Sequence, residues 1–235
     1  IPFTHTGVLA TQPVLKRGST EEDLLVMGGG ITNGWDNVDD NNEAKALHGF
    51  ATLTPCDYFD FTFNMINSGS EQDDNNSNSR TLVDLVATVR PLPDLKISMN
   101  LDWGGEEEGA ADGNYANWWG FAGIVRYDFA LLEKDKKNFF VAVSGEYFDD
   151  DDGARLGDLV VGPATTGVDV WEVTFTLGYM PTENLLLRTE VRYDRASEDM
   201  FFDGHGDDAI PGTSNPDEDW QTTIAFEAAY LFWED

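Results

Sequence analysis

The chain is poor in basic residues and in cysteine, and each shortage excludes a class of protein. It carries 14 Lys and Arg against 44 Asp and Glu over 235 residues, a formal net charge of −30. Because such a surface repels phosphate groups, nucleic-acid binding is excluded. Cys56 is the one cysteine in the sequence, so neither a disulfide framework nor a CxxCH haem site can form.

Long apolar runs are also missing. No segment approaches the roughly 20 apolar residues of a membrane-spanning helix, but a barrel strand needs only about 9–11 residues. The segment Ile1–Thr4 has no charged or apolar signal-peptide region, so we expect the chain to begin at a processing site or inside a longer gene product. With 41% hydrophobic and 12% aromatic residues, the chain is too apolar to be disordered.

What the sequence has in abundance is strict alternation of apolar and polar residues. It runs through the segments Leu95–Trp103, Trp171–Tyr179, Leu185–Asp194 and Trp220–Phe232. A period of two over this many residues predicts strands with one apolar and one polar face. Roughly eleven such strands follow one another, each near spanning length. The predicted fold class is therefore all-β, a single antiparallel up-and-down transmembrane β-barrel over residues 1–235.

The connections between these strands alternate in kind. Thr54–Asp57, Arg90–Asp94 and Met180–Asn184 are short and contain proline. The others are long, acidic and rich in Gly and Asn, near residues 33–43, 67–79, 104–117, 149–168 and 195–219. Short turns at one end and long loops at the other are typical of transmembrane barrels. The chain of such a barrel begins and ends on the same side of the membrane. Here the first strand would begin on the long-loop side and the last strand would end on the short-turn side, so we expect an odd number of upstream strands to be missing.

The polar face predicts a water-filled lumen, because its charges are mixed in sign. The pore-lining candidates are Asp84, Lys96, Asn100, Arg126, Glu146, Glu172, Arg188, Glu190, Arg192 and Glu227. Aromatic residues near strand ends predict girdles at the membrane interfaces, and the candidates are Trp103, Trp118, Trp119, Tyr147, Trp171, Tyr179, Tyr193, Trp220 and Tyr230. In the alternative, a soluble barrel, the apolar face would point inward.

Two acidic loops offer oxygen ligands for Ca²⁺, with Asp36, Asp39 and Asp40 in one and Asp149 and Asp151 in the other. Neither has EF-hand spacing, so we expect at most weak binding, and the simpler interpretation is a solvated loop. The histidines lack the spacing of a zinc site, and we expect no catalytic residue and no cofactor. The run Gly28–Gly30 lies in a strand-like segment, where glycine allows curvature or close side-chain packing.

Several segments carry a family resemblance, namely Ile1–Gly7, Asn33–Asn37, Gly145–Asp149, Trp171–Thr174 and Leu187–Asp194. Over essentially its whole length, the chain resembles the OmpL-like β-barrel porins of Gram-negative outer membranes. In such proteins an IPFTHTG-like segment lies well inside the sequence. The resemblance implies a pore-forming protein with no known catalytic residues. One departure is the ending, since Phe232 and Trp233 are followed by two acidic residues where many such barrels end on an aromatic.

The expected function is passive diffusion of small hydrophilic solutes or ions through the outer membrane, among lipid and lipopolysaccharide. The acidic loops predict a preference for cations that weakens as salt rises. One alternative is a structural barrel, either plugged or sheathing a partner protein. A second is a secreted acidic β-sandwich that binds Ca²⁺. A second copy of the chain or a partner chain could also close the wall.

Overall fold

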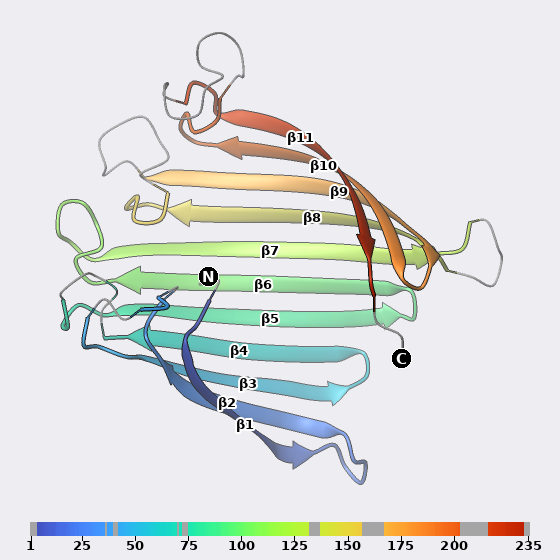
Figure 1. Ribbon diagram of the computed structural model, residues 1–235, viewed down its shortest axis with the longest axis horizontal. Coiled ribbons are helices and arrows are strands. Elements are labelled where there is room, and N and C mark those ends of the chain that lie inside the picture. Colours follow the sequence, from blue (N-terminus) through green and yellow to red (C-terminus); the bar gives the residue numbers. More distant parts are fainter. Residues whose placement is uncertain are drawn as a thin grey trace.

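The computed structural model describes residues 4–35, 37–39, 42–69, 71, 75–131, 137–156, 167–202 and 216–232. These residues form an eleven-stranded sheet whose strands lie in chain order (Figure 1). The strands are β1 (Gly7–Lys16), β2 (Asp23–Thr32), β3 (Ala46–Cys56), β4 (Phe59–Ser68), β5 (Arg80–Leu92), β6 (Leu95–Glu106), β7 (Ala116–Phe129), β8 (Phe139–Asp150), β9 (Val168–Thr182), β10 (Leu185–Ala196) and β11 (Trp220–Tyr230). Over the same residues, no helix has the length and hydropathy that crossing a membrane requires.

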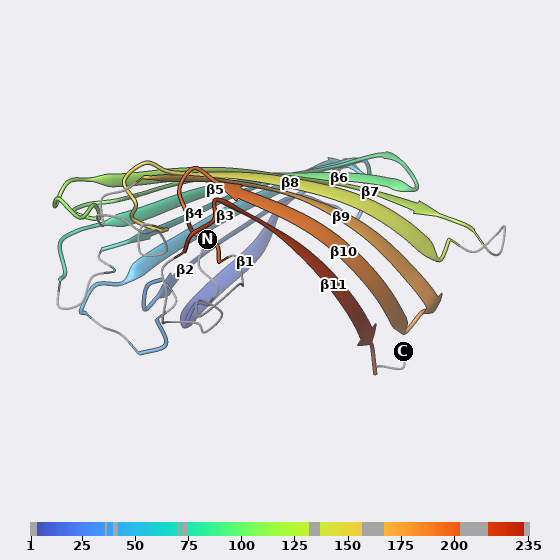
Figure 2. The same ribbon diagram turned by 90° about the horizontal axis from the view of Figure 1, so that it is seen from above.

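Each strand pairs antiparallel with the next one in the sequence, which confirms the predicted all-β, up-and-down architecture. The ladder between β6 and β7 runs from Leu95–Tyr127 to Glu106–Ala116 without a register shift. The sheet curves into a trough (Figure 2). The strands β1 and β11 lie at its two edges, and within the described residues each of them pairs with one neighbour.

Burial shows which face of the sheet is crowded. In β9, Trp171, Val173 and Phe175 are between 39% and 48% exposed. Their neighbours on the other face, Glu172 and Thr176, are buried. Side chains converge on the concave face of a curved sheet and diverge on its convex face. The polar face is therefore the concave one, and the apolar face points outward.

Long and short connections lie at opposite ends of the strands (Figure 1). We call these ends the loop end and the turn end. The connections at the loop end span 33–45, 69–79, 107–115, 151–167 and 197–219, and those at the turn end span 17–22, 57–58, 93–94, 130–138 and 183–184. The loop expected over 104–117 is shorter in the structure, because Gly104 and Gly105 continue the ladder opposite Trp118 and Asn117.

Aromatic rings on the concave face lie across glycines of the adjacent strand. The cross-strand pairs are Gly28–Phe50, Gly104–Trp118 and Gly178–Phe140. At each glycine, an added Cβ would lie less than 3.0 Å from atoms of the facing ring. The close packing expected of the run Gly28–Gly30 is thus confirmed at Gly28. These pairs let large rings occupy the crowded face of a curved sheet.

Candidate functional site

The ten pore-lining candidates share the concave face. Strand register fixes this placement, because residues that pair directly across a ladder point to the same side. Lys96 faces Arg126, Glu146 faces Glu172, and Arg188 faces Glu227. Asp84 and Asn100 join the same face through the ladder between β5 and β6. The structure thus brings all ten onto one wall, while their role in lining a pore stays a prediction.

On β9, β10 and β11 the charged residues form a ladder of ion pairs. Arg192 lies 2.5 Å from Asp194 and 3.7 Å from Glu172, and the side chains of these two carboxylates are buried. Arg188 bonds to Glu227 and lies 3.5 Å from Glu190. A buried carboxylate needs such a partner, since an unpaired charge costs several kcal/mol. The ladder therefore fixes charged groups at defined heights along the wall.

Aromatic residues form a band at each end of the apolar face. At the loop end, the rings of Trp119 and Tyr147 lie 5.2 Å apart, and Trp171 lies 5.4 Å from Tyr193. At the turn end, Tyr179 stacks 4.4 Å from Phe139. The girdle candidates on this face are Trp103, Trp119, Tyr147, Trp171, Tyr179, Tyr193, Trp220 and Tyr230. Their placement suits interfacial girdles, a role that stays a prediction.

Trp118 does not belong with these residues, and its assignment to a girdle is wrong. It pairs with Gly104 on the concave face and is only 2% exposed. Successive residues of a strand point to opposite faces, so Trp118 and Trp119 cannot share one. Both residues lie near a strand end, but the alternation of side chains places them on opposite faces of the sheet.

Trp118 instead belongs to a group that we call the Trp–Arg stack, formed by Trp35, Arg80, Trp118 and Arg155. The two tryptophan rings meet edge to face at 6.4 Å. The guanidinium of Arg155 lies 5.0 Å from the Trp35 ring and 5.3 Å from the Trp118 ring. Arg80 lies 5.3 Å from Trp35. These distances are within the range of cation–π attraction, so the stack joins two loop-end connections to the wall.

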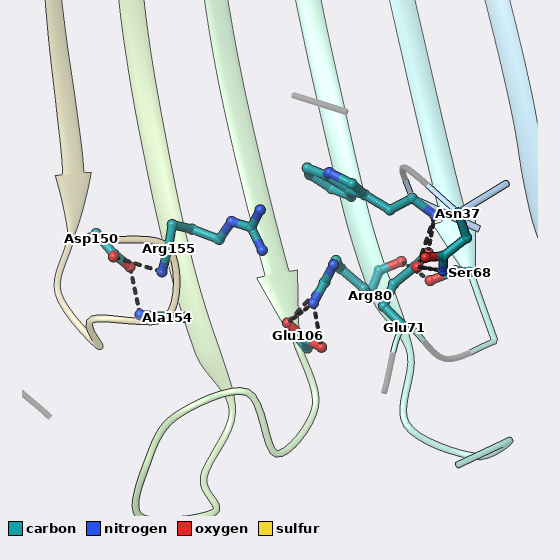
Figure 3. A network of polar contacts seen from close by, with 9 residues as sticks. Asn37, Ser68, Glu71, Arg80, Glu106, Asp150, Ala154 and Arg155 are labelled. Carbon is teal, nitrogen blue, oxygen red and sulfur yellow. Dashed lines mark hydrogen bonds and ion pairs between the residues drawn. The ribbon is translucent and has the colours of Figure 1, made fainter. Parts of the chain in front are cut away.

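Carboxylates hold the Trp–Arg stack in place (Figure 3). Arg80 donates two hydrogen bonds of 2.8 Å to Glu106. The backbone N–H of Trp35 donates to Glu71 at 2.8 Å. Asp150, which is fully buried, accepts backbone N–H bonds of 2.7–3.0 Å from residues 154–156. Residues 33–35, 37–39 and 151–156 at the loop end are therefore anchored above the concave face, an arrangement that sequence periodicity could not indicate.

Of the Ca²⁺ candidates, the structure brings Asp149 and Asp151 together with Asp169. Carboxylate oxygens of these three residues lie within 4.8 Å of one another. The negative charge of Asp149 is the main cause that raises the pKa of Asp151 above its usual value. Asp39 is exposed in a different connection, and Asp36 and Asp40 lie outside the described residues. The three carboxylates offer the oxygen ligands that Ca²⁺ prefers.

Comparisons with known proteins identify a family. A family model described as "Putative beta-barrel porin-2, OmpL-like" matches residues 1–232. Among solved structures, the chain is similar to "NanC porin structure in rhombohedral crystal form", with 12% sequence identity and a TM-score of 0.49. That match covers 97% of this chain and 93% of the other. No curated protein matches the sequence.

Proposed function

The chain belongs to the OmpL-like family of β-barrel porins, and we propose that it allows small hydrophilic solutes and ions to diffuse through the outer membrane, with a preference for cations. The observation that carries the proposal is the division of the sheet into a charged concave face and an apolar convex face. No chemical step is involved, and we assign no catalytic residue.

The convex face supports a position in lipid. Phe175 and Phe226 are 48% and 80% exposed there, an arrangement that water would penalise and hydrocarbon would favour. The backbone groups of the inner strands pair within the sheet, as a hydrocarbon environment requires because an unpaired N–H or C=O is costly there. The two aromatic bands lie at either end of this apolar zone, where head groups would meet amphipathic rings.

The balance of charge on the concave face supports the preference for cations. Arg80, Arg188 and Arg192 are each neutralised by a carboxylate on the same wall. In the described part of the chain, Asp84, Asp102 and Glu146 form no ion pair within 4.0 Å, and neither does Lys96, so the unpaired charge on this face is mainly negative. The acidic loop-end connections add to this field. A negative potential raises the local concentration of cations, and added salt screens it.

Single-channel recording of the full-length protein in a planar bilayer tests the proposal. Under a KCl gradient we expect stable open steps and a reversal potential that favours K⁺. The triple variant Asp84→Asn, Asp102→Asn and Glu146→Gln should shift that potential toward the non-selective value. A reversal potential that favours Cl⁻ would contradict the cation preference. Silence from protein shown to be inserted would contradict diffusion, and would favour the plugged or partner-sheathing barrel.

A further inference from the structure

A cavity of about 250 Å³ opens on the concave face over β1–β5, and we propose that it binds a small organic cation, a primary ammonium on a compact apolar body. Leu9, Phe50, Ile66 and Leu82 give it an apolar wall, and Asp84 is the carboxylate that lines it. The inference names a solute class for the lumen and thus rests on the proposed function. An apolar concave wall with a few convergent polar groups is typical of small-molecule sites.

The charge of the cavity is fixed by Asp84. Asn64 donates a hydrogen bond of 2.5 Å to one oxygen of this carboxylate, and Asn100 donates to the other. Both donors are neutral amides, so they orient the carboxylate without removing its charge. Asp102 pairs directly with Asp84 across the ladder, and its Oδ1 is buried without a hydrogen-bond partner among the described residues.

Two carboxylates that face each other across a ladder repel, and a nearby cation relieves that repulsion. Elsewhere on the concave face an arginine supplies that cation, as Arg80 does for Glu106 and Arg192 does for Asp194. Within the described residues no lysine or arginine lines this cavity. A cationic solute would therefore gain here the attraction that a neutral sugar or an anion would not.

The apolar wall favours an organic cation over a hydrated metal ion. The ring of Phe50 lies across Gly28 and occupies the space that a Cβ of that residue would need. Phe50 and Asp84 both line the cavity, and an ammonium near an aromatic ring gains cation–π attraction. Ile66 and Leu82 are buried in the same wall and can contact an apolar body. A hydrated K⁺ or Ca²⁺ would gain nothing from these groups.

Two histidines bound the cavity on its loop-end side. The rings of His5 and His48 meet edge to face at 4.2 Å. His48 Nε2 lies 3.0 Å from the Thr32 hydroxyl, which fixes the orientation of this ring. A neutral imidazole offers one acceptor nitrogen, and an ammonium has three donors. An ammonium can thus donate one hydrogen bond to Asp84 and a second one to an imidazole nitrogen.

Isothermal titration of benzylamine into the full-length protein in detergent micelles tests the site, with empty micelles subtracted. We expect saturable binding at one site, and no such binding of benzyl alcohol, its uncharged counterpart. Asp84→Asn should weaken benzylamine binding by about tenfold or more, as loss of a hydrogen bond to a charged group predicts. Phe50→Leu should weaken it several-fold, on the order of one cation–π contact. Asp112→Asn, in the connection 107–115, removes the same charge far from the cavity and should change nothing.

Equal binding of the amine and the alcohol, or unchanged binding to Asp84→Asn, would overturn the inference. Phe50→Leu provides the second test if Asp84→Asn does not fold. The titration needs no conduction, so the two proposals can fail separately. A protein that binds benzylamine but stays silent in a bilayer contradicts the pore, and one that conducts without binding contradicts the cavity as a site.

Discussion

At Gly104, the lack of a side chain allows Trp118 to be buried against the wall. A Cβ at this position would lie less than 3.0 Å from atoms of the Trp118 ring. Because Trp118 also supports Arg155, we expect Gly104→Ala to lower the free energy of unfolding by about 1–3 kcal/mol, the usual cost of overpacking. Urea unfolding in detergent, followed by tryptophan fluorescence, measures the change.

Gly49 provides the matched control for that measurement. It also lies within a strand, but no atom stands within 4 Å of the position that its Cβ would take. Gly49→Ala should therefore leave the unfolding transition nearly unchanged. If Gly104→Ala and Gly49→Ala cost the same, the loss would reflect β-propensity in general and not the contact with Trp118.

Alternation was enough to place single residues on the correct face of a strand. It brought Asp84, Glu172 and Arg192 onto one wall, since the period of two is a property of the extended backbone. The same pattern gives no distances between side chains, so it did not predict the hydrogen bond from Arg192 to Asp194. Nearness to a strand end predicts a girdle position for Trp118, but the parity of its position in β7 places it on the concave face.

At the scale of elements, the junction of β8 and β9 carries a prediction about Ca²⁺. Asp149 pairs with Asp169, just beyond the aromatic band on the outward face, and Asp151 completes the group. We expect Ca²⁺ to raise the thermal unfolding midpoint at neutral pH by about 2–4 °C, a modest shift for a chain of this size. Asp151→Asn should remove most of the rise, whereas Asp112→Asn should keep it. An equal rise in the unsubstituted protein and in both variants would indicate a general ionic effect.

The same group predicts the sign of a pH effect. The pKa of Asp151 is raised in the folded protein, chiefly by the charge of Asp149, so the folded state holds this proton more tightly than the unfolded chain does. The carboxyl therefore opposes folding once it is ionised, and the cost is relieved as the pH falls through its folded pKa. The stabilisation by Ca²⁺ should shrink over the same fall in pH, because protonation removes both the repulsion and the ligand.

The strands were predictable from the sequence, but the contacts between the loop-end connections were not. Each strand repeats a local pattern that identifies it, whatever lies around it. The Trp–Arg stack, by contrast, joins Trp35 in one connection to Arg155 in another through Trp118. Contacts between irregular segments far apart in the sequence have no period, so only the folded register reveals them.

On the scale of the whole molecule, charge is unevenly divided between the two ends. At the turn end, basic and acidic side chains compensate each other in pairs such as Arg17–Asp57, Arg90–Asp60 and Arg126–Asp128. The loop-end connections are mainly acidic and account for most of the net charge of −30. A pore with this division would be strongly cation-selective at one mouth and weakly selective at the other, because the fixed charge sets the local ion concentrations.

Such a division predicts rectification, with a larger current when cations enter through the loop end. In that direction the acidic mouth retains counter-ions inside the pore and the ion concentration rises, whereas the opposite voltage depletes it. Cys56 is exposed at the turn end, so a thiol reagent too large to pass the pore reports which side that end faces. We expect the asymmetry at low salt and its loss near 1 M KCl, where the Debye length is about 3 Å. Symmetric current–voltage curves at low salt would show that the loop-end charge does not act on the conducting path.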